Sequence, residues 1–133
     1  MRVTLHCDGG SRGNPGPAAV GVVITDSEGE VIGEVSQAIG IATNNVAEYE
    51  AVLRGLARAS ELGATEIDLI GDSELIAKQI TGDYRVKHAD MKPLHAKALA
   101  LLSGFDDWTI RTVPRAQNAD ADALVNQALD AAA

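Results

Sequence analysis

Several acidic side chains of this sequence occupy positions where they could bind a metal ion. Asp8 ends an alternating apolar segment and directly precedes a glycine-rich loop, and Asp72 follows a second apolar segment and a glycine. Glu48 lies at the margin of an apolar helical stripe, an unusual place for a carboxylate. Asp120 and Asp122 both fall in the first turn of the last expected helix, and helical periodicity does not choose between them.

Carboxylates that come from separate elements, without a cluster of His or Cys, suit hard cations such as Mg²⁺ or Mn²⁺ rather than zinc. Two such ions about 3.5–4 Å apart can activate water and stabilise the leaving oxygen of a phosphodiester. The acids therefore predict a metal-dependent reaction on a phosphate ester.

Each acid also has a structural explanation. A turn-forming role suits Asp8, and helix capping suits Asp72. Glu50 differs from Glu48, because it shares a helix face with Arg54 and is expected to form a solvated ion pair. The residues alone leave these alternatives open for Asp8 and Asp72 and favour a functional role for Glu48.

The apolar pattern predicts which elements must position these side chains. Alternation indicates strands and a period of 3.6 indicates helices, which gives the order βββαβααβα. We expect an α/β fold: a mixed five-stranded sheet, three antiparallel strands then parallel strands, with helices on both faces, in one domain over residues 1–133. The expected strands cover residues 2–7, 18–25, 31–40, 66–70 and 108–113, and the expected helices cover 44 or 45 to 63, 72–80, 90–102 and 118–129.

The composition is that of an ordinary globular chain. Of 133 residues 46% are hydrophobic, and no apolar run is long enough to cross a membrane, so we expect a cytoplasmic protein without a membrane partner. The single cysteine, Cys7, lies in an alternating strand and is expected to be a small buried hydrophobe.

The formal net charge of −8 disfavours a nucleic-acid partner, because phosphates are usually bound by Lys and Arg. The segment 78–97 is an exception, with five Lys or Arg side chains against two Asp. Cations bound by the acids would also reverse the local charge. An acidic chain of this kind can therefore still bind a polyanion.

Four segments resemble one family in order and spacing. They read CDGGSRGNPGPAAVG, TNNVAEYEAVLRGL, IDLIGDSELI and VPRAQNADADAL, and together they span essentially the whole chain. The sequence is similar to type 1 ribonucleases H. The resemblance implies a ribonuclease H-like fold and a monomeric endonuclease that hydrolyses the RNA strand of RNA–DNA hybrids, leaving 5′-phosphate and 3′-hydroxyl ends, with two Mg²⁺ or Mn²⁺ ions per site when substrate is bound.

The resemblance also assigns roles to individual residues. Asp8, Glu48, Asp72 and Asp122 match the family's metal-binding carboxylates, which makes Asp120 a capping residue. Asp122 is chosen over Asp120 because it occupies the family's Asp-x-Leu position, whereas periodicity did not distinguish the two residues.

Polar residues near two of the acids match the family's substrate contacts. Asn14 and Thr43 are expected near a DNA phosphate, and Asn44 and Asn45 near the RNA minor groove, where a side chain can sense 2′-hydroxyls.

The sequence departs from the family in three places. The loop before Asp122 lacks the His found in some members, so Arg115 is the candidate for a phosphate or product contact. Residues 82–90 are too few for the basic handle of other members, which is typical of the compact archaeal and actinobacterial type. Glu74 stands where many relatives have Gln, and its charge would either repel substrate or adjust the metal site.

Two other functions compete with this prediction. One is a nuclease of the same superfamily that acts on duplex RNA or structured DNA. The other is a hybrid-binding module without catalysis, and the presence of all four acids argues against it.

Overall fold

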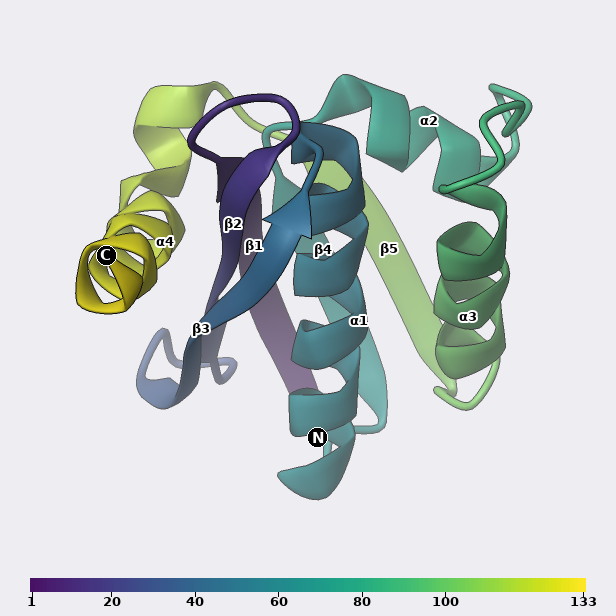
Figure 1. The fold of residues 1–133 in the computed structure, drawn as a ribbon. Helices are drawn as coiled ribbons and strands as arrows, with labels where there is room; N and C mark the ends of the chain where they lie inside the picture. Colours follow the sequence, from purple (N-terminus) through teal and green to yellow (C-terminus); the bar gives the residue numbers. More distant parts are fainter.

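A mixed five-stranded sheet forms the centre of the computed structural model, which describes residues 1–133 (Figure 1). The strand order is β3-β2-β1-β4-β5, with β1–β2 and β2–β3 antiparallel and β1–β4 and β4–β5 parallel. The expected order of strands and helices is confirmed. The strands are β1 (Arg2–Ser11), β2 (Gly16–Thr25), β3 (Val31–Ala42), β4 (Glu66–Gly71) and β5 (Asp107–Thr112).

Helices cover both faces of this sheet. Alternate residues of β2 separate two cores, because Val20 and Val22 pack in a core shared with α1, α2 and α3, whereas Ala19 packs against Val125 of α4. β2 is therefore buried on both faces along most of its length. The helices are α1 (Asn44–Glu61), α2 (Glu74–Thr81), α3 (Lys92–Leu102), the short 3₁₀ helix η1 (Arg115–Asn118) and α4 (Ala119–Ala132).

β1 is longer than its sequence predicts. Asp8 was expected to end the strand, but β1 continues to Ser11, with Gly9 opposite Val20 of β2. A Cβ atom on Gly9 would lie 2.2 Å from the backbone of Ala47, so glycine here permits α1 to approach the strand. The prediction that a glycine-rich loop begins directly after Asp8 was therefore wrong.

α1 starts where it was expected, whereas α2, α3 and α4 start one or two residues later than expected. Thr43 caps α1, and its Oγ1 accepts a hydrogen bond from Val46 N at 3.2 Å. Ser73 caps α2 in the same way through Ile76 N, which leaves the carboxylate of Asp72 free of capping. The structural explanation of Asp72 as a helix cap is therefore wrong, because Ser73 is the cap.

The parallel ladder between β1 and β4 ends at His6 and Ile70. Asp8 and Asp72 each lie two residues beyond this last pair, so both acids occupy the place where the two strands separate. Ligand sites of open α/β sheets lie beyond the carboxyl ends of parallel strands. The topology therefore brings the two acids to one end of the sheet.

Two further expectations concern buried and apolar groups. Cys7 is buried in the core on the α1 side, as predicted. None of the helices has the length and apolar character required to cross a bilayer.

Candidate active site

Three carboxylates from separate elements meet at the end of the sheet. Asp8 comes from β1, Glu48 from the first turns of α1, and Asp72 from the turn between β4 and α2. One oxygen atom from each lies within 4.8 Å of the others. This spacing allows all three oxygens to coordinate a common cation.

Backbone geometry holds these side chains in place. The close approach of α1 to β1 lets Gly9 N donate a hydrogen bond to Glu48 Oε1 at 3.0 Å. Asp72 Oδ2 is buried without any hydrogen-bond partner. An unpaired buried carboxylate oxygen is costly, so this oxygen is suited to bind a positively charged ligand.

The electrostatics of the cluster are unfavourable for ionised acids. Burial, and then the negative charge of Asp72, raises the pKa of Asp8 to about 7. Burial and the charge of Asp8 raise the pKa of Glu48 to about 9. Titratable groups shifted this far in a cleft are typical of functional sites.

Asp122 lies in the same cleft as these acids, whereas Asp120 does not. Asp120 lines a different hollow, beside His6. Arg115 Nη2 is 3.8 Å from Asp122 Oδ1, and Asn126 Nδ2 donates to the backbone oxygen of Asp122 at 3.2 Å. Two residues of helix separate the side chains of Asp120 and Asp122 by about 200°, which explains their different surroundings.

Of the expected substrate contacts beside α1, Asn44 lines the cleft, whereas Thr43 lines another hollow. Asn14 Oδ1 accepts a hydrogen bond from Asn44 N at 3.0 Å, and Asn44 Oδ1 accepts one from Ser11 N at 2.9 Å. These bonds join the β1–β2 loop to the start of α1. Asn45 is exposed, and Thr43 is the helix cap described above.

Comparison with known proteins places this architecture in a family. The family model "Reverse transcriptase-like" matches residues 6–128. Ribonuclease HI of Halobacterium salinarum is 50% identical over 129 residues, which are 97% of this chain. The crystal structure of RNase H1 from the same archaeon superposes with a TM-score of 0.96 at 49% identity and covers 98% of both chains. The chain belongs to the type 1 ribonuclease H family.

A further ribonuclease H structure extends the likeness to a nucleic-acid complex. LC11-RNase H1, isolated from compost and solved in complex with RNA/DNA hybrid, has a TM-score of 0.93, 43% identity and 98% coverage of both chains. The chain spans 65% of the length of the Halobacterium ribonuclease HI and 37% of the length of mycobacterial relatives that are 50% identical to it.

The two sequence departures near the site have distinct surroundings. Arg115 lines the cleft with an 81% exposed side chain. Glu74 is not among the cleft residues, and its Oε1 pairs with Lys78 Nζ at 2.7 Å. Contact with Lys78 lowers the pKa of Glu74. The charge of Glu74 is thus balanced within α2.

Two residues at or beside the cleft were missed at the level of sequence. Arg12 lines the cleft, and its Nη2 pairs with Asp130 Oδ1 of α4 at 2.6 Å. Asn118 is buried beside the site and bonds to the backbone of β1. The arginine within a glycine-rich loop was a usable signal, whereas nothing in the local pattern around Asn118 indicates its burial.

Proposed function

We propose that this chain is an endonuclease that hydrolyses the RNA strand of RNA–DNA hybrids, leaving 5′-phosphate and 3′-hydroxyl ends. One observation carries the proposal: Asp8, Glu48 and Asp72 bring their oxygens together at the end of a ribonuclease H sheet. The likeness to LC11-RNase H1, which was solved with RNA/DNA hybrid, supports the choice of substrate.

The acid cluster has the chemistry of a divalent-cation site. Asp72 has a buried oxygen without a partner, and Asp8 and Glu48 have raised pKa values. A bound cation would neutralise these acids, and no side chain of the cluster does so. An all-oxygen set suits Mg²⁺ or Mn²⁺. We propose that Asp8, Glu48, Asp72 and Asp122 are the catalytic ligands of two such ions when substrate is bound. Bound cations would supply Lewis-acid activation of water and of the scissile phosphate.

The chain's own contribution is to hold the ligand oxygens in position before a cation arrives. Asp8 lies within a paired strand, and the Gly9 N–H group orients Glu48. Ligands held by rigid elements need little reorganisation in the reaction. Burial of these fixed acids, and then the repulsion between their charges, raises the pKa values of Asp8 and Glu48.

We assign substrate recognition to residues of the β1–β2 loop, the start of α1 and η1. The hydrogen bonds of Asn14 and Asn44 brace the β1–β2 loop against α1. We propose that Asn14 and Thr43 contact a DNA phosphate, that Asn44 and Asn45 read the RNA minor groove, and that Arg115 contacts a phosphate. Glu74 would influence the substrate or the metal site only indirectly, because its carboxylate is paired with Lys78.

The overall charge of −8 is compatible with this substrate when cations occupy the cleft. Arg12 and Arg115 add positive charge at its rim. A single domain over residues 1–133, a monomeric state and a cytoplasmic location stay predictions.

A cleavage assay tests the proposal directly. An RNA–DNA hybrid, duplex RNA and duplex DNA of one sequence, each labelled on one strand at a time, are incubated at matched salt with Mg²⁺, Mn²⁺ or EDTA. We expect cleavage of the RNA strand of the hybrid alone, 5′-phosphate products and no reaction in EDTA. A duplex with a single ribonucleotide should be cut poorly, because successive 2′-hydroxyls must be read.

The other outcomes separate the alternative functions. Preferential cleavage of duplex RNA or branched DNA would identify a nuclease with a different substrate. Hybrid binding without cleavage in either metal would identify a binding module, and Asp8→Asn serves as the inactive control in each case.

A further inference from the structure

Asn118 is one of only three buried polar or charged residues of the chain, and it is 2% exposed. It is the last residue of η1 and directly precedes α4, where an asparagine usually caps the helix. Its side chain makes no capping hydrogen bond. Instead, Asn118 Nδ2 donates to the backbone oxygen of Cys7 at 2.9 Å, across 111 residues of sequence.

The position of Cys7 explains why a side-chain donor is present. The ladder between β1 and β4 ends at His6 and Ile70, so Cys7 has no partner residue on β4. A Cβ atom on Gly71 would lie 3.5 Å from the Cys7 oxygen, which shows that this carbonyl faces the opening between the strands. A buried carbonyl needs a donor, and Asn118 provides it where β1 and β4 separate, one residue before Asp8.

This hydrogen bond joins the two backbones that carry Asp8 and Asp122. Cys7 directly precedes Asp8, and Asn118 precedes Asp122 by four residues, about one helical turn. α4 is also attached to β2 and β3, since the Ala121 oxygen packs on Gly21 and Ser36 Oγ donates to the Leu124 oxygen at 2.7 Å, and farther along it pairs with the β1–β2 loop through Arg12 and Asp130.

We propose that Asn118 is a positioning residue that holds the start of α4, and with it Asp122, in register with Asp8. The inference rests on the proposed function for the roles of the two acids. Asn118 Oδ1 is buried without a partner, so the contribution of the side chain lies in its N–H group and its length. Asn118 touches neither substrate nor metal in this proposal and acts through Asp122.

The test uses Asn118→Leu, which keeps the approximate shape and removes the donor. We expect kcat on the hybrid to fall about ten- to hundredfold, the usual cost of a displaced catalytic group, with the KM for hybrid within about twofold of wild type. The Mg²⁺ concentration for half-maximal activity should rise. Gln79→Leu is the matched control, because it removes the other long-range buried hydrogen bond, from Tyr49 Oη at 2.6 Å, outside the cleft.

Gln79→Leu should lower the melting temperature while its Mg²⁺ dependence stays that of wild type. A double-mutant cycle provides the second criterion. If Asn118 acts through Asp122, adding Asn118→Leu to an Asp122→Asn enzyme should change kcat by less than about twofold, whereas a general structural role would lower kcat by the same factor in both backgrounds. Equal factors, or an unchanged kcat in the single variant, would overturn the proposal.

Amide chemical shifts give a readout that does not depend on activity. Titrating the metal-free wild type with Mg²⁺ should move the signals of Asp8 and Asp122 with one midpoint, and in Asn118→Leu the Asp122 signal should no longer follow that of Asp8. Coupled shifts in a wild type that fails to cut hybrid would reject the proposed function but keep the role of Asn118. If Asn118→Leu does not fold, Asn118→Ser is measured by the same criteria.

Discussion

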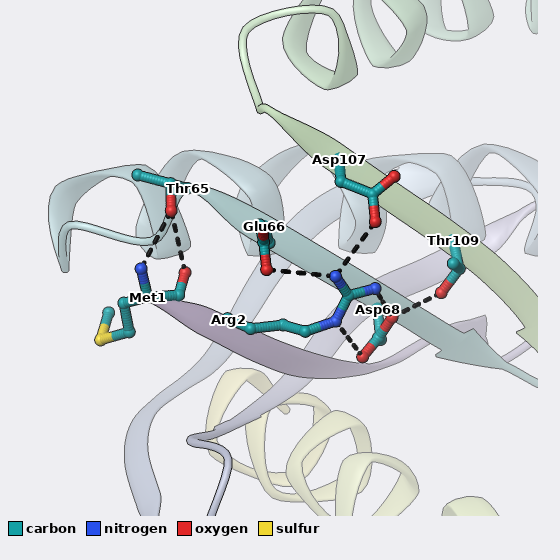
Figure 2. A network of polar contacts seen from close by, with 7 residues as sticks. All are labelled: Met1, Arg2, Thr65, Glu66, Asp68, Asp107 and Thr109. Atoms are coloured by element: carbon teal, nitrogen blue, oxygen red, sulfur yellow. Dashed lines mark hydrogen bonds and ion pairs between the residues drawn. The ribbon is translucent and has the colours of Figure 1, made fainter.

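β1 and β4 carry an acidic cluster at each end, and the two clusters differ in their counter-charge. At the amino end of the strands, Arg2 binds three carboxylates (Figure 2). Its Nε and Nη2 donate to the two oxygens of Asp68 at 3.0 and 2.6 Å, and its Nη1 donates to Glu66 and Asp107 at 3.2 and 3.1 Å. The hydrogen bonds from Arg2 lower the pKa of Asp68.

At the carboxyl end, the same two strands and α1 gather Asp8, Glu48 and Asp72 without such a cation, and the pKa values of Asp8 and Glu48 rise. In the Arg2 cluster the carboxylates are neutralised by a side chain of the protein, which indicates a structural role. In the other cluster no side chain neutralises the carboxylates, so a bound cation would have to do so, which indicates a functional role.

The largest expected effect comes from removing an acid at the carboxyl end. Asp8→Asn, Glu48→Gln or Asp72→Asn should each lower hybrid cleavage by several orders of magnitude, because each side chain supplies a ligand oxygen to the cation site. Initial rates in Mg²⁺, with circular dichroism to verify folding, measure the loss.

Glu50→Gln is the control for these variants. Glu50 pairs with Arg54 at 3.3 Å along α1, where both side chains are partly buried, and an i,i+4 helix pair contributes only about 0.3–0.5 kcal/mol. Its rate should equal that of wild type. More than about a tenth of the wild-type rate in Asp8→Asn or Asp72→Asn would contradict metal catalysis by this cluster.

The second comparison lies within α4. Asp122→Asn should reduce the rate strongly and raise the Mg²⁺ requirement, because Asp122 lines the cleft. Asp120→Asn should leave the rate unchanged and cost at most about 1 kcal/mol through a weaker helix-dipole interaction. Rates across a Mg²⁺ titration, with thermal melts, distinguish the two. An inactive Asp120 variant beside an active Asp122 variant would show that the motif is assigned two residues out of place.

Sequence alone predicted the elements that carry the acids, because apolar periodicity and strand alternation are local properties. The order of elements and the mixed sheet are confirmed. The predicted end of β1 was wrong, because the glycines after Asp8 were interpreted as loop residues. The approach of Ala47 to Gly9, which explains the glycine there, depends on tertiary packing. Periodicity also left Asp120 and Asp122 equivalent, and only the family resemblance distinguished them.

The missed residues share a physical cause. Asn118 bonds to Cys7 and Arg12 pairs with Asp130, over separations of 111 and 118 residues. No local pattern encodes a partner so distant. Charge balance within a cluster is equally non-local, so the difference between the two ends of β1 and β4 emerges only when the strands are paired.

The third prediction concerns pH and metal together. The unfolded chain has ordinary acids, with pKa values near 3.9 and 4.3, whereas Asp8 and Glu48 in the fold have values of about 7 and 9. The folded state therefore binds more protons, and the stability of the metal-free protein should fall as the pH rises from about 4 to 9.

Thermal melts in EDTA and in Mg²⁺ measure this dependence. At pH 8 in EDTA, Asp8→Asn should melt above wild type, and the difference should shrink toward pH 4. Mg²⁺ should stabilise wild type at pH 8 and have little effect on the variant. A metal-free wild type that gains stability between pH 5 and 8 would contradict the raised pKa values.

The smallest effect is expected at the Arg2 cluster. Arg2→Met should lower the melting temperature by a few degrees at pH 7, because three neighbouring carboxylates lose their common partner, while kcat on the hybrid stays unchanged. The pKa of Asp68 is lowered in the fold, so the stabilisation is present above the ordinary Asp value and is lost as the pH falls through the lowered one. Wild type and variant should therefore melt at closer temperatures near pH 3 than at pH 7. Arg58→Met, which breaks a single exposed pair with Glu61, is the matched control and should have a smaller effect at both pH values. A fall in kcat without a fall in melting temperature in Arg2→Met would mean that the amino-end cluster takes part in the reaction, and the distinction drawn between the two ends of the strands would then be wrong.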